Sequence, residues 1–296
     1  MTDERDAAAP PALLGADFVR ELEVLRRRLE IKARSGASGE HVAKRRGGSA
    51  EFQEHRAYAP GDDMRRIDWA AYARTGEPVL KLFRAEEDVV ARLVCDGSAS
   101  VREDKLLVSK RLAAAIGYMT LAHSERAQVL VAGEGIRREH NPVRGRGGLP
   151  GLFRSLSAIE PGGKTDLARA IDTVVQRAGR PGMLVTISDF FDSGPVTSAL
   201  GRAVQAGHDV ALVQVVSPDE VDPNLEGDWE LEDAETGARV EVTMDPAAIQ
   251  AYVLRFAGLC EELRAWARRH GGTYVRVRTD EPLESAIRRF VSRSVD

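Results

Sequence analysis

The stretch VVARLVCDGSAS (residues 89–100) decides the fold of this 296-residue chain. It starts with a β-branched, apolar run that is typical of a strand buried on both faces of a parallel sheet. The run ends at Asp96, and the hydroxyl side chains of Ser98 and Ser100 follow at two-residue spacing. In doubly wound sheets, ligands bind at the carboxyl ends of the parallel strands. The stretch therefore predicts both a central strand and a binding edge.

Strands and helices alternate along the rest of the chain. Apolar runs of strand length stand at residues 127–133, 183–189, 210–216 and 273–278, and helical patterns stand at 104–123, 149–158, 166–178, 195–206, 246–270 and 282–293. This alternation predicts an α/β fold with a doubly wound, mostly parallel sheet and helices on both faces. WELEDAETGARVEV (229–242) breaks the alternation, because its two apolar–polar runs flank a Glu-Thr-Gly turn and so predict a β-hairpin.

The chain is expected to divide into three parts. Residues 1–16 are rich in Ala, Pro and acids and are predicted to be disordered. Residues 17–88 hold a predicted helix at 17–34, with Asp17 as its N-cap, and then a Gly-rich polar segment without strong periodicity. Residues 89–296 form the α/β domain, with an acidic hairpin insertion at 219–245.

Composition excludes several classes of protein. Lys and Arg number 42 against 46 Asp and Glu, a net charge of −4 that does not indicate a nucleic-acid or membrane-surface protein. Cys95 and Cys260 form no CxxC motif, which excludes a cysteine zinc site and makes a disulfide framework unexpected. No apolar run reaches 18 residues and the start does not resemble a secretory signal, so we expect no transmembrane segment and a cytoplasmic protein.

The charge is unevenly distributed. Residues 20–46 carry nine Lys or Arg against four Glu, whereas residues 219–245 carry eleven Asp or Glu against one Arg. The basic segment raises the alternative of nucleic-acid contact, but it contains few aromatic residues and the acidic hairpin opposes that function. We therefore expect no nucleic-acid partner.

Oxygen side chains stand at two further turns of the predicted sheet edge. Thr165 lies in a Gly-Gly-Lys-Thr turn before a helix, and Asp189 ends the strand at 183–189. With Asp96, Ser98 and Ser100 they form a set of hard oxygen donors, the ligand type that suits Mg²⁺, Mn²⁺ or Ca²⁺. The set predicts one divalent-cation site. The alternative for Asp96 to Ser100 alone is an N-cap of the following helix.

The predicted ligands favour binding over catalysis. If the two carboxylates act through coordinated water, the ion keeps most of its charge and an open position, which suits a carboxylate from a partner protein. No His lies in the three turns, so a general base for hydrolysis is missing. The alternative function is a metal-dependent phosphoester hydrolase that uses the same ion. Because carboxylates of the segment 219–245 would close the site, we expect that segment to lie away from the ion or to regulate it.

Two resemblances to known families support this interpretation. The order of DGSAS, GGKTD and ISD resembles a von Willebrand factor A domain with its metal-ion-dependent adhesion site, in which Asp96, Ser98, Ser100, Thr165 and Asp189 match the metal-binding positions. From about Gly39 onward the chain also resembles the bacterial domain-of-unknown-function family fifty-eight, through EFQEHRAYAPGDDMRRIDWAAYARTGEPVLKLF (51–83), GDWELEDAETG (227–237) and TYVRVRTDEP (273–282). Members of that family commonly accompany MoxR-type AAA+ ATPases. The resemblance implies an adaptor or chaperone-like partner of such an ATPase or of its client, with Mg²⁺ as the first choice of ion.

The segment at 56–74 combines charged and aromatic residues around a Pro-Gly-Asp turn. One interpretation is an internally paired loop with Trp69 buried. The other is a partner contact made by Arg56, Tyr58, Asp62, Arg65, Asp68 and Trp69. We expect the segment to be ordered, with Trp69 buried.

Overall fold

A computed structural model describes residues 16–35, 51–60, 62–84, 89–123, 125–191, 194–223 and 227–292. These residues belong to two compact units, one made of Met1–Ile31 and Val89–Asp296 and the other of Lys32–Asp88. The N-terminal helix α1 (Ala16–Ser35) is thus divided from the rest of the expected segment 17–88, because its residues up to Ile31 group with the α/β unit. The predicted disorder of the first residues lies outside the described ranges.

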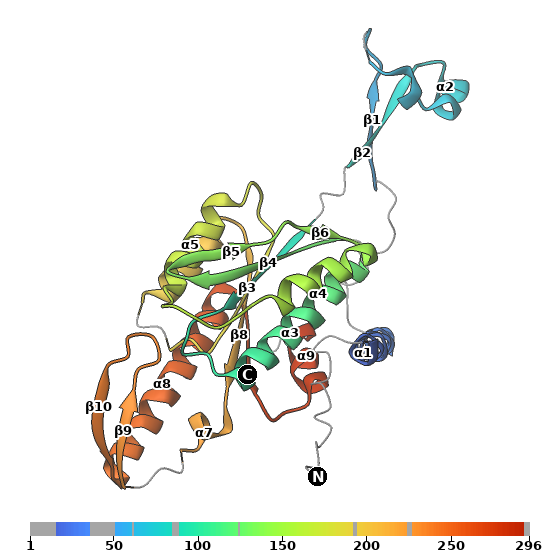
Figure 1. The fold of residues 1–296 in the computed structure, drawn as a ribbon. Coiled ribbons are helices and arrows are strands. Elements are labelled where there is room, and N and C mark those ends of the chain that lie inside the picture. Colours follow the sequence, from blue (N-terminus) through green and yellow to red (C-terminus); the bar gives the residue numbers. More distant parts are fainter. Residues whose placement is uncertain are drawn as a thin grey trace, which may run out of the picture. The chain divides into compact units, whose positions relative to one another are not determined.

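The α/β unit is built on one sheet of seven strands (Figure 1). Its parallel members are β3 (Val90–Asp96), β4 (Arg126–Gly133), β7 (Met183–Ser188), β8 (Asp209–Val216) and β11 (Thr273–Arg278). The sheet order is β11-β8-β7-β3-β4-β5, and both β5 (Gly135–Glu139) and β6 (Val143–Arg144) pair antiparallel with β4. The prediction of a mostly parallel, doubly wound sheet is confirmed, although the two antiparallel strands were not predicted.

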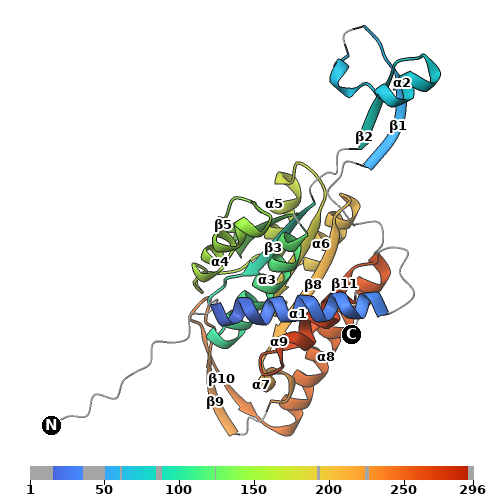
Figure 2. The ribbon, with the colours of Figure 1, turned by 90° about the vertical axis from the view of Figure 1, so that its right-hand side faces the viewer.

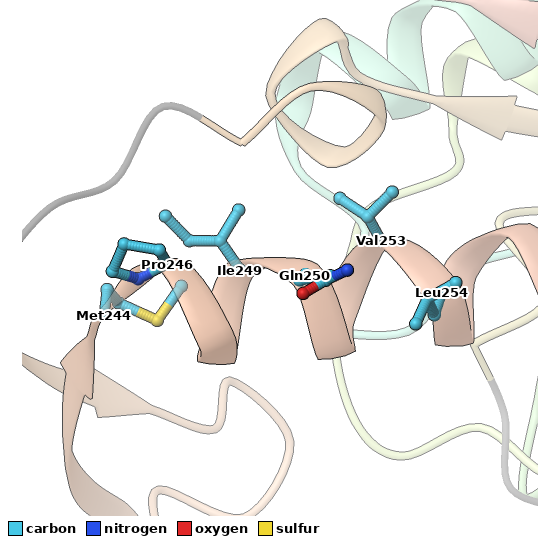
Figure 3. Close-up of a pocket in the computed structure, with 6 residues that line it drawn as sticks. All are labelled: Met244, Pro246, Ile249, Gln250, Val253 and Leu254. Carbon is cyan, nitrogen blue, oxygen red and sulfur yellow. The ribbon is translucent and has the colours of Figure 1, made fainter.

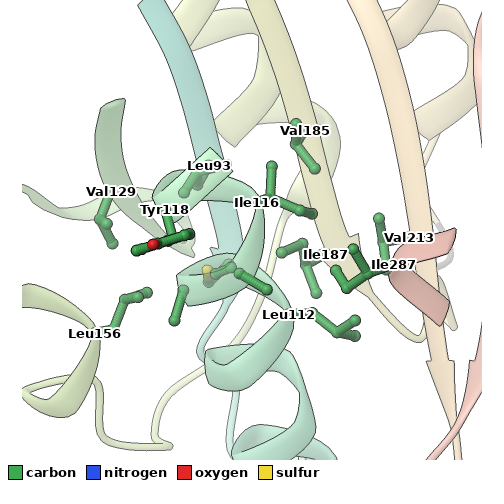
Figure 4. Packing of buried hydrophobic residues seen from close by; sticks show 14 of the residues in the cluster. Leu93, Leu112, Ile116, Tyr118, Val129, Leu156, Val185, Ile187, Val213 and Ile287 are labelled. Atoms are coloured by element: carbon green, nitrogen blue, oxygen red, sulfur yellow. The ribbon is translucent and has the colours of Figure 1, made fainter. Parts of the chain in front are cut away.

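Helices cover both faces of this sheet. One face carries α1, α3 (Glu103–Ala122), α4 (Leu149–Ser157) and α9 (Leu283–Val291), and the other carries α5 (Leu167–Arg177), α6 (Val196–Gln205) and α8 (Pro246–His270). Successive side chains along each strand point to opposite faces of the sheet. Leu93 and Cys95 of β3 therefore lie in one core cluster and Val94 in the other. In Figure 4, Leu112 and Ile116 of α3 pack against strand residues of the first cluster.

Helix α1 packs on the α3 face of the sheet unit, as the two ribbon views agree (Figure 1 and Figure 2). Its buried residues Phe18, Leu22 and Leu25 recur at helical spacing. The guanidinium of Arg111 on α3 lies 5.0 Å from the Phe18 ring centre and 3.1 Å from a carboxylate oxygen of Glu21. The helix begins at Ala16, so Asp17 lies in its first turn and is not its N-cap.

The unit of residues 32–88 is an antiparallel pair of strands with two short helices between them. Strand β1 (Glu51–Ala57) pairs with β2 (Val79–Arg84), and the chain between them forms η2 (Met64–Arg66) and α2 (Trp69–Thr75). Asp68 is the buried N-cap of α2, because one carboxylate oxygen accepts hydrogen bonds from the backbone N–H groups of Ala70 and Ala71, both at 3.1 Å.

The prediction that Trp69 is buried is wrong, since its side chain is 60% exposed. Trp69 is the first residue of a seven-residue helix whose inward position is taken by Ala71. Its ring packs edge-on against exposed Tyr72, with ring centres 6.1 Å apart. Among the described residues of this unit, the large apolar side chain that is buried instead is that of Leu80 on β2, which is 3% exposed.

The predicted hairpin is present as β9 (Gly227–Glu232) and β10 (Arg239–Met244), which pair with each other in a separate two-stranded sheet. It follows β8 and the short helix α7 (Pro218–Val221) and leads into α8. Asp245 caps α8 by accepting a hydrogen bond of 2.7 Å from the backbone N–H of Ala248. Within the described ranges, no helix has both the length and the apolar composition that crossing a bilayer requires.

The exposure of Trp69 predicts a small effect of its truncation. Trp69→Ala should lower the free energy of unfolding by about 1 kcal/mol or less, because an exposed ring loses mainly its edge contact with Tyr72. Leu80→Ala in the same unit should cost about 2–5 kcal/mol, since it opens a cavity. Chemical denaturation followed by circular dichroism measures both. A loss for Trp69→Ala as large as that for Leu80→Ala would show that Trp69 is buried in solution.

Candidate metal centre

The predicted metal-site residues lie where the winding of the sheet reverses. From β3 the chain crosses to β4 on one side, and it later returns to β7 on the other side of β3. The register of β3 and β7 pairs Cys95 with Ile187, which places Asp96 beside Ser188 at the carboxyl ends of both strands. Such a switch point is the general ligand-binding crevice of doubly wound sheets.

Asp96 joins the predicted turns to one another. Its side chain is 5% exposed, and one carboxylate oxygen accepts hydrogen bonds from the backbone N–H of Ser98 and the hydroxyl of Thr165, both at 3.0 Å. The other oxygen accepts a hydrogen bond of 2.7 Å from the hydroxyl of Ser188. Sequence reasoning did not single out Ser188, although it directly precedes Asp189. Asp96 therefore accepts hydrogen bonds from two turns and from the end of β7 at once.

Backbone contacts fix the Ser98 turn to the Thr165 turn. The N–H of Ala99 donates to the carbonyl of Gly163 at 3.0 Å, and the N–H of Gly162 donates to the carbonyl of Gly97 at 2.9 Å. A Cβ atom at Gly97 would lie 2.7 Å from Arg137 and Val131, so glycine is required at this close approach. The hydroxyl oxygens of Ser98 and Ser100 then lie 2.9 Å apart, with Ser98 buried and Ser100 exposed.

Asp189 is buried and paired with a cation that the sequence did not reveal. One of its carboxylate oxygens accepts a hydrogen bond of 3.0 Å from the N–H of Phe191, and the other lies 2.6 Å from the ammonium of Lys105. The same ammonium lies 2.7 Å from a carboxylate oxygen of Glu220. Lys105 is 3% exposed, in the first turn of the helix that leaves the site. Charged residues in a first helical turn are usually solvated, so the pattern carries no signal for this pairing.

Burial and charge act together on these groups. Burial raises the pKa of the Asp189 carboxyl above its ordinary value; the Lys105 ammonium opposes this shift, and the nearby Asp96 adds to it. Burial alone would lower the pKa of Lys105, but the carboxylates of Asp189 and Glu220 outweigh it and raise that pKa. Lys105 is therefore held as a cation.

The tip of the acidic hairpin reaches the site. The hydroxyl of Ser100 donates a hydrogen bond of 3.0 Å to the carboxylate of Glu235, which lies in the turn between β9 and β10. Of the two expectations for the acidic segment, this contact contradicts the one that places the segment away from the ion, and the one that makes it a regulator stays a prediction. The physical reason is that β8 runs parallel to β3 and β7, so an insertion that follows β8 starts at the same edge of the sheet.

The hydrogen-bonded set has a large excess of negative charge. Its described members include four carboxylates against the one ammonium of Lys105, a net charge of −3, and the carboxylates are those of Asp96, Asp189, Glu220 and Glu235. Asp96 and Asp189 are buried whereas Glu220 and Glu235 are half-buried, and buried charges of one sign require compensation. A cation is therefore the ligand that the electrostatics of this edge favour.

The chemistry of the donor set, which consists of hydroxyl and carboxylate oxygens, suits a hard divalent cation. With Mg–O bonds of about 2.1 Å in an octahedron, neighbouring ligand oxygens lie about 3.0 Å apart. The hydroxyl of Ser100 lies 2.9 Å from that of Ser98 and 3.0 Å from the carboxylate of Glu235. Among the described residues, no group of three or more His, Cys, Asp or Glu side chains is arranged to hold a metal. A metal at this edge would thus depend on hydroxyl donors, as the predicted set does.

The six predicted partner-contact residues belong to the unit of residues 32–88. Asp62 is engaged within this unit. Its carboxylate accepts a hydrogen bond of 2.7 Å from the guanidinium of Arg56 and one of 2.9 Å from the backbone N–H of Ala59. Asp68 is the buried helix cap described above, whereas Arg65 and Trp69 are exposed and Tyr58 is half-buried. Their role as a partner contact stays a prediction.

A shallow apolar groove lies elsewhere, along the first turns of α8 (Figure 3). It is lined by Met244, Pro246, Ile249, Gln250, Val253 and Leu254. None of these side chains is ionisable, so the groove offers no acid, base or metal ligand. The switch point therefore remains the candidate functional site.

Comparison with known proteins gives a family and several structural neighbours. The family described as "Protein of unknown function DUF58" matches residues 54–258. "Uncharacterized protein Rv1480" of Mycobacterium tuberculosis is 32% identical over 309 residues, which cover 99% of this chain and 96% of that protein. Among solved structures, BatB from Bacteroides thetaiotaomicron is 16% identical with a TM-score of 0.45, over 69% of this chain and 98% of BatB. A von Willebrand factor type A protein from Catenulispora acidiphila is 13% identical with a TM-score of 0.42, over 72% and 43% of the two chains.

The pairing of Lys105 predicts a specific cost of removing it. Lys105→Ala should lower the free energy of unfolding by about 3–5 kcal/mol in EDTA, because it leaves two carboxylates without their cation. Lys110→Ala on the same helix is the control, since its ammonium contacts a single carbonyl oxygen, that of Ser157, at 3.5 Å and its loss should cost clearly less. Urea denaturation measures both values.

A second variant separates charge from packing. Adding Asp189→Asn to Lys105→Ala should recover part of the lost stability, because it removes one of the unpaired charges. Equal losses for Lys105→Ala and Lys110→Ala, with no recovery in the double variant, would contradict the ion pair as the cause.

Proposed function

Because the chain belongs to the DUF58 family, whose description assigns no function, we propose from its site that it is a metal-ion-dependent protein-docking module. The observation that carries the proposal is the gradient of exposure along a set of oxygen donors. Asp96 and Ser98 are buried at the switch point, and the set opens to solvent at Ser100. An ion held there would be bound from within by the protein and approachable from outside.

Each residue of the set has a separate task in this proposal. The hydroxyls of Ser98, Ser100 and Thr165 would hold the ion directly, and the carboxylates of Asp96 and Asp189 would hold it through water. When bound, the ion supplies an electrophilic position for a carboxylate from outside. Asp96 orients the hydroxyl of Thr165 and the turn of Ser98, and Lys105 fixes the position of Asp189. Mg²⁺ is the proposed ion, because hydroxyl and water ligands suit it and it retains several waters.

The charges and contacts of the site favour docking over hydrolysis. None of the hydrogen bonds described at this edge involves a histidine, and Lys105 is held as a cation between two carboxylates and so cannot accept a proton. We therefore propose that the protein is not an enzyme.

The partner is expected to present a single Asp or Glu side chain. Without Glu235, the remaining carboxylates and Lys105 carry a net charge of −2, which one divalent ion balances. A single incoming carboxylate then meets a neutral site with an electrophilic ion at its centre. The family resemblance makes a MoxR-type AAA+ ATPase or its client the proposed partner, and a cytoplasmic location goes with that proposal.

The proposal predicts one divalent ion per chain. Isothermal titration with Mg²⁺ or Mn²⁺ should show a single site in the wild type, and Thr165→Val should weaken it strongly by removing a hydroxyl ligand while keeping the shape of the side chain. Asp219→Ala is the control, because it removes an exposed carboxylate that makes no contact with the site hydroxyls. Equal affinity in Thr165→Val and wild type would place the ion elsewhere or nowhere.

Docking should depend on the ion. A co-expressed MoxR-type ATPase from the same host should be captured by the wild type, and capture should fall with EDTA and with Ser98→Ala while circular dichroism shows an intact fold. Moderate salt should reduce capture only slightly, since a coordinated carboxylate is held by the ion and is screened less than surface ion pairs. Capture that is unchanged by EDTA and by Ser98→Ala would leave the ion no role in docking.

A further inference from the structure

We infer that Glu235 is an internal carboxylate ligand for the ion at this site, and that the hairpin tip thereby occupies the position that a partner's carboxylate would take. The inference rests on the proposed function, because it assigns a regulator to the same site. Its starting point is a direct contact: the carboxylate of Glu235 accepts a hydrogen bond of 3.0 Å from the hydroxyl of Ser100, across 135 residues of sequence.

The hairpin turn is built so as to present Glu235. A carboxylate oxygen of Asp233 accepts hydrogen bonds from the backbone N–H groups of Glu235 at 2.8 Å and Thr236 at 3.1 Å. Gly237 closes the turn with a φ of 70° and donates its N–H to the carbonyl of Asp233 at 2.7 Å. These contacts engage the side chain of Asp233 within the turn, and the side chain of Glu235 projects to Ser100.

The charge of Lys164, beside Thr165, acts weakly on the same hairpin tip. The pKa of Asp233 is lowered mainly by the N–H groups of Glu235 and Thr236, and to a smaller extent by the ammonium of Lys164. Lys164 directly precedes Thr165, so the tip lies within electrostatic reach of a second turn of the site. The contact that joins the hairpin tip to the site is therefore the hydrogen bond between Ser100 and Glu235.

Glu235 differs from the other carboxylates of the set in what it already binds. Both oxygens of Asp96 accept hydrogen bonds from the site turns, and Asp189 and Glu220 share the ammonium of Lys105. Among the described residues, the side chain of Glu235 hydrogen-bonds to Ser100, which is itself a predicted ligand. The hydroxyl of Ser100 and the carboxylate of Glu235 are 3.0 Å apart, a separation that also allows two neighbouring ligands to share one Mg²⁺.

The hairpin can leave without disturbing the main sheet. Strands β9 and β10 hydrogen-bond to each other and form their own two-stranded sheet, separate from the seven-stranded one. Because a two-stranded hairpin is only marginally stable on its own, its movement would cost the contacts that β10 makes with α8, while the hydrogen bonds of the main sheet would stay intact. A partner's carboxylate would then replace that of Glu235 as the ligand. Because this exchanges one anion for another, further contacts between the partner and the protein must supply the free energy that favours the exchange.

The test uses Mn²⁺ as the probe ion and the full chain. Water-proton relaxivity reports how many exchangeable waters the bound Mn²⁺ retains, and a titration followed by electron paramagnetic resonance gives its affinity. Glu235→Gln keeps a hydrogen-bond acceptor for Ser100 but removes the negative charge. It should bind Mn²⁺ about tenfold more weakly than the wild type, because affinity at such sites follows the ligand charge count, and its relaxivity should rise by the contribution of one added water.

Glu230→Gln is the matched control, because it removes a carboxylate from β9 of the same hairpin, away from the tip, and should behave as the wild type does. Acetate, used as a carboxylate probe, should lower the relaxivity of Mn²⁺-loaded Glu235→Gln at concentrations that leave the wild type unchanged.

The outcomes separate this inference from the proposed function. If the wild type binds Mn²⁺, Thr165→Val does not, and Glu235→Gln matches Glu230→Gln in affinity, relaxivity and response to acetate, the inference alone is overturned. If the wild type and Thr165→Val bind Mn²⁺ equally, or neither binds it, the metal site itself is overturned and the inference falls with it.

Discussion

The buried carboxylate of Asp96 is the interaction on which the whole site depends. It terminates the central strand and accepts hydrogen bonds from its own turn, from the Thr165 turn and from the end of β7. These three segments come from different parts of the chain and meet only because parallel strands end at one edge. Without this acceptor, the hydroxyl of Ser188 would be buried without the partner it has, and the Thr165 turn would be joined to the Ser98 turn by backbone contacts alone. The sheet thus brings the turns to one edge, and one side chain links them.

The charges around this anchor determine which ligands the site can accept. Carboxylates outnumber ammonium groups in the described set, and their burial makes the excess costly. Lys105 compensates the inner part of the set, between Asp189 and Glu220, whereas the outer part at Ser100 and Glu235 has no such partner in the hydrogen bonds described. An external cation is therefore favoured on the outer side, at the place where the hydroxyl donors face solvent. The division between inner and outer parts follows from the first turn of α3, which carries Lys105.

Sequence patterns predicted the sheet and its edge well because buried parallel strands are apolar on both faces and end abruptly. The run that ends at Asp96 shows both properties, and each strand and helix expected after it is present within one or two residues. Strand β1 was missed because EFQEHRA has no apolar alternation. Trp69 was misplaced because the sequence of a two-turn helix does not show which side faces inward. The contacts of Lys105 and Glu235 depend on where a helix and a hairpin lie in space, and charged residues at such positions are ordinarily solvated.

The pairing of Lys105 has a consequence for the life of the protein in a cell whose metal supply varies. A group that belongs to the polypeptide compensates the two inner carboxylates, and it is present from the moment the chain is synthesised. These inner ion pairs are therefore present at any free concentration of the metal, although one ammonium offsets the charge of only one of the two carboxylates. Loss of the metal would leave these inner ion pairs in place and would change what the outer, hydroxyl side of the site can bind.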